Sequence, residues 1–246
     1  MMLVKVMSLS VGGSMSDNIV LNPARYNSNS TPPASLVDRS RYHNNGVFTN
    51  VTQVRLPSGK WLYSFNGASS RITITDSPSI QNIFITGGTI LIWINPLSDG
   101  ENDVGRIIDK SDLATLGFYS YVYDEVAGYV KLGLAVLWTG GWATWESDRV
   151  IPLNKYSHIG ITYNGSNVAN NPIFTLNGNS ITVTETLAPV GAIISDASEN
   201  LRIGDNTASA ASFDGFLHPL KVSKRVLSVG EIRNNFESEK RWFGII

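Results

Sequence analysis

Three tryptophans in one short stretch have the side chains best suited to binding chemistry. Trp138, Trp142 and Trp145 follow one another closely, with Gly140-Gly141 between the first two. A flat indole can stack on the apolar C–H face of a sugar while neighbouring polar side chains bind its hydroxyls. Because successive strand residues point to opposite faces, Trp142 and Trp145 would face opposite ways on one regular strand, and at most one points inward. The two alternatives for this group are packing in a core or between subunits, and a glycan-binding surface.

Residues suited to catalysis are sparser. His43, His158 and His218 lie far apart in the sequence, and no glycine-rich phosphate loop is present. The absence of cysteine excludes disulfides, thiolate metal sites and cysteine nucleophiles. The residue types therefore favour a binding or structural protein over an enzyme.

The composition excludes further classes of protein. Of the 246 residues 42% are hydrophobic and only 16% are charged, and the net charge is −1 without a long run of either sign. Electrostatic capture of nucleic acid is thus disfavoured. No apolar run approaches the ~20 residues that span a bilayer, and the first residues lack the pattern of a signal peptide. We expect no nucleic-acid partner and no membrane insertion.

Short strands separated by turn signals fill most of the chain. Residues 71–75 alternate polar and apolar, whereas residues 89–95 are apolar on both faces and suit a central strand. Residues 117–123 and 129–137 flank a predicted hairpin turn, and Asn177-Gly178 suits a second one. The pattern predicts an all-β, antiparallel two-sheet sandwich.

The end of the chain predicts one short helix. Asp214-Gly215 is a tight-turn dipeptide that precedes a strand. Ser228 and Glu231 then have the spacing of a capping box, in which each side chain satisfies a free backbone amide of the first helical turn. The apolar residues that follow fit one helical face.

Several motifs, in order, resemble those of laminin G-like domains with the concanavalin A-like jelly-roll fold. The closing motif is the stretch from Phe213 to Ile232, which resembles the family's C-terminal signature. The other matching stretches are Val37-Asp38-Arg39-Ser40 with Asn44-Asn45-Gly46, Phe65-Asn66-Gly67, Ile92-Trp93-Ile94-Asn95-Pro96, residues 156–165, and Leu201-Arg202-Ile203-Gly204. The resemblance covers about Ser35 to Phe236 and implies an antiparallel jelly-roll sandwich.

The same resemblance raises the questions of catalysis and calcium. Glucanases of this fold carry the pattern E-x-D-x-x-E, of which Glu146-Ser147-Asp148 has the first two acids but not the third. Relatives often hold calcium, for which Asp38 and Asn45 are the matching oxygen donors. In the closing motif, however, His218-Pro219 replaces residues that are often acidic in the family. The resemblance therefore implies a non-catalytic module with calcium as an optional ligand.

Residues 1–34 differ in composition from the rest. Gly, Ser, Asn and Pro dominate, apart from the apolar Ile19, Val20 and Leu21. Such a segment buries too little apolar surface to offset the entropy lost on ordering. We expect residues 1–34 to be an extended arm that docks on a partner, with Ile19–Leu21 as its anchor or as an edge strand, and residues 35–246 to be the jelly-roll domain.

These features together predict an interaction module. A single module with an unusual arm and without an export signal suits a protein assembled on a virion, as a bacteriophage capsid decoration, head-fibre or tail protein. We expect other structural proteins of the assembly as partners, and homo-oligomers are compatible with this role. The alternative is a lectin-like module that binds cell-surface glycans, whether secreted or displayed; a glycoside hydrolase is the remote alternative.

Overall fold

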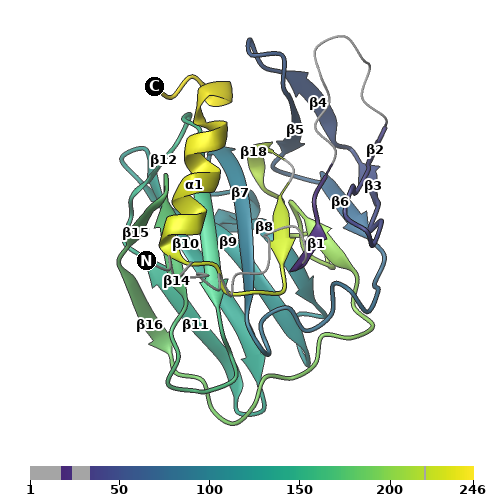
Figure 1. Cartoon of the computed structure of the whole chain (residues 1–246), viewed down its shortest axis with the longest axis vertical. Helices are drawn as coiled ribbons and strands as arrows, with labels where there is room; N and C mark the ends of the chain where they lie inside the picture. The colour runs from purple at the N-terminus through teal and green to yellow at the C-terminus, as the bar shows by residue number, and fades with distance from the viewer. Residues whose placement is uncertain (1–17, 24–33, 219) are drawn as a thin grey trace, which may run out of the picture.

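The computed structural model describes residues 18–23, 34–218 and 220–246. In these residues two antiparallel sheets pack face to face, and one helix, α1 (Val229–Glu239), lies across the front of the sandwich (Figure 1). The predicted all-β jelly-roll sandwich with a short C-terminal helix is thereby confirmed. No helix among the described residues has the length and hydropathy needed to cross a membrane.

The first sheet has nine strands, with the order β15-β14-β13-β7-β18-β5-β4 and with β19 pairing to both β7 and β1. Its strands are β1 (Ile19–Leu21), β4 (Thr52–Arg55), β5 (Trp61–Asn66), β7 (Gly88–Pro96), β13 (Ser157–Tyr163), β14 (Ile173–Leu176), β15 (Asn179–Ile181), β18 (Asp214–Leu217) and β19 (Lys221–Ser223).

The second sheet has ten strands, with the order β16-β11-β10-β9-β8-β17-β6-β3-β2 and with β12 pairing to β10. Its strands are β2 (Ser35–Leu36), β3 (Gly46–Thr49), β6 (Arg71–Ile74), β8 (Val104–Ser111), β9 (Gly117–Val126), β10 (Tyr129–Trp138), β11 (Gly141–Ser147), β12 (Ile151–Pro152), β16 (Val183–Leu187) and β17 (Leu201–Ile203). A short 3-10 turn, η2 (Glu101–Asp103), precedes β8.

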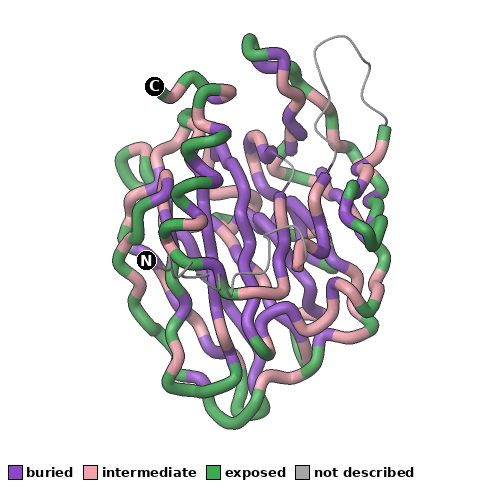
Figure 2. The backbone as a smooth tube through the Cα atoms, viewed as in Figure 1, coloured by how far each residue is buried: buried purple, intermediate pink, exposed green. Residues whose placement is uncertain are grey.

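The core lies between the sheets, where alternate residues of each strand point inward. Figure 2 shows the buried residues concentrated in the central strands and the exposed ones in the loops around them. Side chains of β7, β13 and β10 dominate this interior, including Ile92, Ile161, Tyr163, Leu132 and Leu134. This is the period-2 pattern expected for strands with one face in a shared core.

The outer face of the nine-stranded sheet is covered by α1 and the 3-10 turn η3 (Lys240–Phe243). The capping box predicted at Ser228 and Glu231 starts the helix. Trp93, on the outer side of β7, stacks on Phe243 with ring centroids 3.9 Å apart, and its Nε1 donates to Glu239 at 2.8 Å. The outer apolar residues of this sheet therefore form a second, smaller core.

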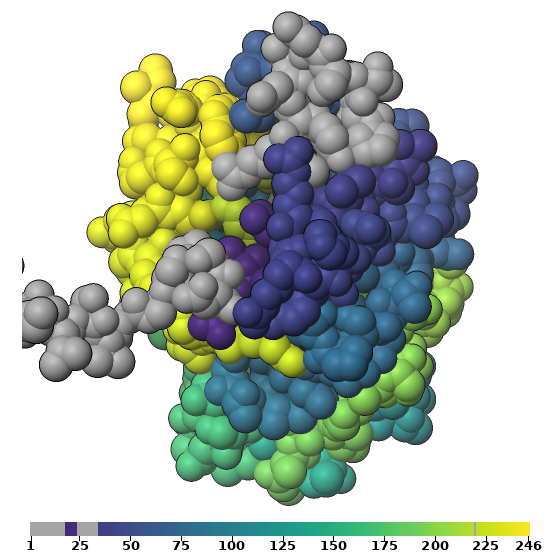
Figure 3. All heavy atoms as spheres, turned by 45° about the vertical axis from the view of Figure 1, so that its right-hand side comes forward, coloured from purple at the N-terminus to yellow at the C-terminus, as the bar shows by residue number. Residues whose placement is uncertain are grey.

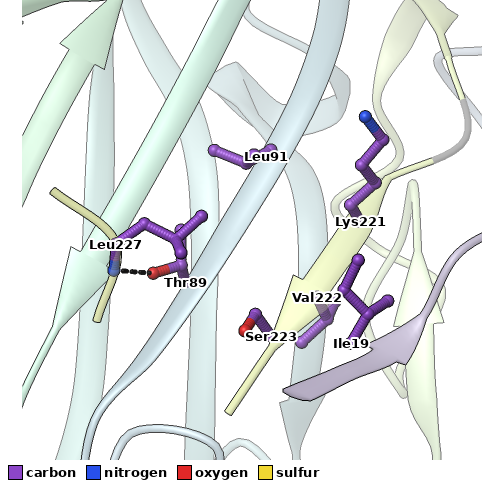
Figure 4. A pocket seen from close by; sticks show the side chains of 7 residues that line it. All are labelled: Ile19, Thr89, Leu91, Lys221, Val222, Ser223 and Leu227. Atoms are coloured by element: carbon purple, nitrogen blue, oxygen red, sulfur yellow. Dashed lines mark hydrogen bonds between the residues drawn. The ribbon is translucent and has the colours of Figure 1, made fainter. Parts of the chain in front are cut away.

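The N-terminal strand β1 belongs to the sandwich. Its residues pair with β19, and Val20 and Leu21 are fully buried. Figure 3 shows the strand between the C-terminal segment and the residues from Ser35 onward. In Figure 4, Ile19 lies against Val222 beside a cavity of about 10 Å³, which at most one water would fill.

The predicted boundary at Ser35 therefore does not separate Ile19–Leu21 from the jelly roll. The apolar content of these three residues is sufficient for a strand because β19 supplies backbone partners and the core accepts the two inward side chains. The rest of the predicted arm, residues 1–17 and 24–33, lies outside the described residues.

His158 lies on the outer side of β13 under α1. Its Nε2 is 3.2 Å from Asn235 Oδ1, and its ring packs edge-on against Trp93; Glu239 and Lys221 are the charged groups nearby. Burial lowers the pKa of His158 from its usual 6.5 to about 4. The neutral imidazole is therefore the form that the folded protein accommodates.

We predict that this histidine makes the protein sensitive to acid. Because the pKa of His158 is lower in the folded than in the unfolded state, the neutral imidazole makes its full contribution to the free energy of unfolding above pH ~6.5. This contribution is lost as the pH falls toward ~4, by roughly 3 kcal/mol in total. Urea unfolding of His158→Gln and of the wild type across this range should show the difference between them shrinking as the pH falls. His43→Asn, at an exposed position with φ 53°, is the control for replacing a histidine outside the core. A constant difference for His158→Gln would contradict the assignment.

Candidate functional site

The three tryptophans of the sequence motif do not share a face. Trp138 and Trp145 point inward and are 1% and 0% exposed, and Trp145 Nε1 donates to Asn171 Oδ1 at 2.7 Å. Trp142 points outward from β11 and is half-buried. Trp138 and Trp145 are thus core residues, because both have the inward parity of their strands, and only Trp142 is accessible to a ligand.

Trp142 is one end of a row of four aromatic rings on the outer face of the ten-stranded sheet. We refer to Trp142, Tyr119, Tyr121 and Tyr123 as the aromatic row. Consecutive ring centroids are 5.0 Å apart from Trp142 to Tyr119, 5.6 Å from Tyr119 to Tyr121 and 5.2 Å from Tyr121 to Tyr123. All four residues are half-buried, so each ring packs on its neighbours and keeps part of its surface in solvent.

Small residues on β10 make room for these rings. Gly133 pairs with Tyr121, and Ala135 pairs with Tyr119 on one side and Thr144 on the other. A Cβ atom at Gly133 would lie 2.3 Å from Cζ of Tyr121, so the tyrosine ring lies across the glycine. The absence of a side chain at Gly133 therefore determines where this ring lies.

Charged side chains line the row on both sides. The guanidinium of Arg106, from β8, lies 3.4 Å from the centroid of the Tyr119 ring, and its Nε is 3.4 Å from Asp109 Oδ2. Lys131 Nζ lies 5.5 Å from the centroid of the Tyr123 ring. A cation above an aromatic face is attracted by the quadrupole of the ring, so these contacts favour the observed orientation of the tyrosine rings.

Burial sets the protonation of these groups. It raises the pKa of Tyr121 and Tyr123 above the usual value, so both hydroxyls stay neutral and can donate or accept a hydrogen bond at physiological pH. Burial raises the pKa of the Asp109 carboxyl to about 6, against the opposing effect of Arg106. At pH 7 the tyrosine hydroxyls are therefore neutral, and the Arg106–Asp109 pair buried beside them is ionised.

The carboxylates considered for catalysis are separated by the fold. Glu146 lies on the outer face of β11, 3.8 Å from Lys131 Nζ, whereas Asp148 lies exposed beyond the end of that strand. Asp124 binds Arg149 Nη2 at 2.5 Å and Lys131 Nζ at 3.2 Å, and Glu125 accepts from the Gly128 amide in the hairpin turn. These contacts are those of ion pairs and turns.

The two residues suggested for calcium lie together, but as a polar brace. Asp38 is buried; its Oδ1 accepts from the amides of Asn22 and Ser40, and its Oδ2 accepts from Ser40 Oγ and the Asn44 amide, at 2.6 to 2.9 Å. Asn45 Oδ1 accepts from the Asp38 amide at 2.9 Å. Four donors thus occupy the carboxylate that an ion would need, and calcium binding stays a prediction. In the closing motif His218 packs edge-on to Phe243, and Pro219 lies outside the described residues.

A second oxygen-lined position is filled by a lysine. The fully buried Lys110 Nζ donates to Asp76 Oδ1 at 2.7 Å, to the Asp196 carbonyl at 3.1 Å and to the Glu199 carbonyl. Its ammonium neutralises the carboxylates and joins two loops to β8, as a bound cation would. No group of three or more metal-binding side chains occurs in the ranges that the structure describes.

A groove at one end of the sandwich is the main alternative to the aromatic row. Two adjoining hollows of about 550 and 480 Å³ share Tyr156 and Phe243, and we refer to them together as the end groove. Trp242 lines it, with Lys60 Nζ 4.3 Å from its ring centroid. The end groove is formed by η3, the turn between β4 and β5 and the segment that leads into β13. It contains none of the residues singled out from the sequence as a ligand site.

Comparison with known families agrees with this architecture. The model described as the concanavalin A-like lectin/glucanases superfamily, of the laminin G type, matches residues 66–233. The chain belongs to this family, as its motifs predicted. No curated protein matches the sequence.

Binding domains of clostridial proteins are among the solved structures with the same fold. The binding domain of Paraclostridial Mosquitocidal Protein 1 superposes with a TM-score of 0.70 at 18% identity, over 94% of this chain and 56% of that one. The receptor binding domain of botulinum neurotoxin D gives 0.63 at 14% identity, over 92% and 54%. The ligand binding domain of botulinum neurotoxin serotype D in complex with N-acetylneuraminic acid gives 0.64 at 13%, over 94% and 55%. This chain thus spans about half the length of these structures, and the likeness concerns the fold.

Sequence reasoning found one residue of the aromatic row and missed three. Tyr119, Tyr121 and Tyr123 alternate along a predicted strand, which was the available signal, but the intervening residues are also largely apolar. The face of the strand that meets the core was therefore undecided until the pairing of β8, β9 and β10 was known.

We predict that Gly133→Ala destabilises the protein by ~1–3 kcal/mol, the usual cost of adding a methyl group where there is no space. The new Cβ would meet the Tyr121 ring at 2.3 Å, so the ring must leave its position over β10. Urea unfolding measures the loss. Gly230→Ala is the matched control: it adds the same atom in α1, where the nearest atom outside the local helix backbone is 3.9 Å away, and should stabilise by ~0.5–1 kcal/mol. Equal effects of the two changes would contradict the described position of Tyr121.

Proposed function

We propose that this protein is a non-catalytic, lectin-like binding module that holds a glycan on the outer face of its ten-stranded sheet. The observation that carries the proposal is the aromatic row, four contiguous half-buried rings on a sheet face. The corresponding face of the other sheet is covered by α1 and η3, so its aromatic residues have partners within the protein.

The chemistry of the row suits sugars. The apolar C–H face of a pyranose packs on an aromatic ring, and its hydroxyls need donors and acceptors at the edge of that ring. Here Trp142 and the tyrosines supply the rings. Glu146 and Thr144, which lie on the same face of β11, supply acceptors, and the hydroxyls of Tyr119 and Tyr121 can both donate and accept. The Tyr123 hydroxyl is buried beside Glu146, so this residue contributes its ring.

The comparisons support a binding role in a general way. The similar structures are described as binding domains, and one is a complex with N-acetylneuraminic acid. This chain spans about half of their length, so their ligands cannot be assigned to it from the likeness alone. The proposal for this chain rests on its own residues.

Assembly on a virion stays a prediction from the sequence. The residues on which it was based lie mainly in 1–17 and 24–33, outside the described part of the chain. Glycan binding by the sandwich is compatible with such a role, because a surface protein of an assembly can also bind a cell-surface glycan.

We predict that Trp142→Ala weakens glycan binding at least about tenfold, equivalent to ~1.4 kcal/mol. The change removes the ring at one end of the row while Ala143 and Trp145 keep the core face of β11 intact. Calorimetric titration with the best ligand from a glycan array measures the effect, and the melting temperature confirms that the variant is folded.

Trp242→Ala provides the matched control, because it removes an indole from the end groove. Binding should persist in this variant. If Trp242→Ala instead abolished binding and Trp142→Ala retained it, the ligand site would lie in the end groove, which would contradict the proposal.

A further inference from the structure

The cations beside the aromatic row are each compensated by a nearby anion. Arg106 is paired with Asp109 at 3.4 Å, Lys131 with Asp124 at 3.2 Å, and Arg149 with the same Asp124 at 2.5 Å. Glu146 adds a second carboxylate 3.8 Å from Lys131. These three cations face three anions, and Arg202, which pairs with Asp109 across β17 and β8, has its own partner in Glu199 at 3.8 Å. The surroundings of the row therefore carry no excess positive charge.

This balance disfavours an acidic sugar. A carboxylated ligand would have to compete with Asp109 or Asp124 for their partners, or lie near Glu146 without a cation of its own. Like charges brought together at a binding surface reduce affinity and select against the wrong partner. The Arg149 guanidinium, which holds the pKa of Asp124 below its usual value, shows that this partner is already engaged.

The length of the row disfavours a single sugar unit. Its four rings are spaced by 5.0 to 5.6 Å, and each step is comparable with the length of one pyranose ring. Neighbouring rings are tilted by about 50° to one another, so they do not form one flat surface. Successive units of a chain that twists along its length can each meet a different ring.

From these observations we infer that the row binds an extended, neutral oligosaccharide of about four units. This inference rests on the proposed glycan-binding function and specifies its ligand class. Each added unit contributes a contact until the rings are all covered. The partly exposed side chains of Lys131, Arg149 and Glu146 act as hydrogen-bonding partners for hydroxyls instead of as a charge site, whereas the Arg106–Asp109 pair is buried.

Calorimetric titration of the purified protein tests both parts of this inference. The probes are linear gluco-, manno-, galacto- and N-acetylglucosamine oligosaccharides of one to six units, and sialylated and uronic oligosaccharides of similar length. For at least one neutral series we expect affinity to increase at least tenfold from the monosaccharide to the tetrasaccharide and then to level off. Binding should change little between ~0.01 and 1 M salt, over which the Debye length falls from ~30 to ~3 Å.

Asp124→Asn gives a gain-of-function test of the charge balance. Asparagine tolerates the φ of 59° at this position, and the change leaves Arg149 without its carboxylate and Lys131 with only the more distant Glu146. We expect the variant to gain at least fivefold in affinity for the acidic oligosaccharides in a salt-sensitive manner. An unchanged affinity for acidic ligands in this variant would contradict the role given to the charge balance.

The remaining outcomes distinguish a failure of the inferred ligand class from a failure of the proposed glycan-binding function. Preferential binding of acidic oligosaccharides by the wild type, or equal affinity for a monosaccharide and a tetrasaccharide, would overturn the inferred ligand class and leave glycan binding in place. Binding of none of the probes would overturn the proposed function and the inference together.

Discussion

Period-2 alternation along the strands is the constraint on which the rest of this structure depends. Each strand that gives one set of side chains to the shared core must present the other set on an outer face. On the nine-stranded sheet, α1 and η3 cover this outer set and bury Trp93 beneath Phe236 and Phe243. The ten-stranded sheet presents a row of rings packed on one another and on Arg106, and this row is the ligand site that we propose.

The two sheets also differ in how their polar groups are satisfied. Under α1, Trp93 Nε1 and Lys221 both bind Glu239, which is 2% exposed, so the charge there is enclosed. Beside the aromatic row, Lys131 and Glu146 remain partly exposed and can exchange protein partners for those of a ligand at small cost. The same fold thus places a structural ionic contact on one outer face and adaptable ones on the other.

Much of the fold followed from local sequence signals. Alternation, turn dipeptides and the capping box at Ser228 indicate a sandwich with one helix, and strand parity correctly places Trp142 and Trp145 on opposite faces. Long-range relations were what the sequence left open: the burial of Trp138 depends on its register opposite Gly141, and Asp38 braces the chain through a bond from the amide of Asn22, sixteen positions earlier. Neither the strand register nor this hydrogen bond produces a periodic pattern in the sequence. The proposed binding surface was therefore only partly predictable, because its rings come from β9 and β11 and its cations from β8, β10 and the segment after β11.

The central claim is that a ligand binds the outer face of the ten-stranded sheet. The most direct test is NMR of the isotope-labelled protein, in which the amide chemical shifts are followed during titration with a neutral tetrasaccharide. The account predicts perturbations that cluster on β8 to β11, at positions such as Arg106, Tyr121, Lys131 and Trp142, and that leave α1 and the end groove unaffected. Perturbations centred on Tyr156 and Trp242 instead, with the aromatic row unchanged, would contradict it.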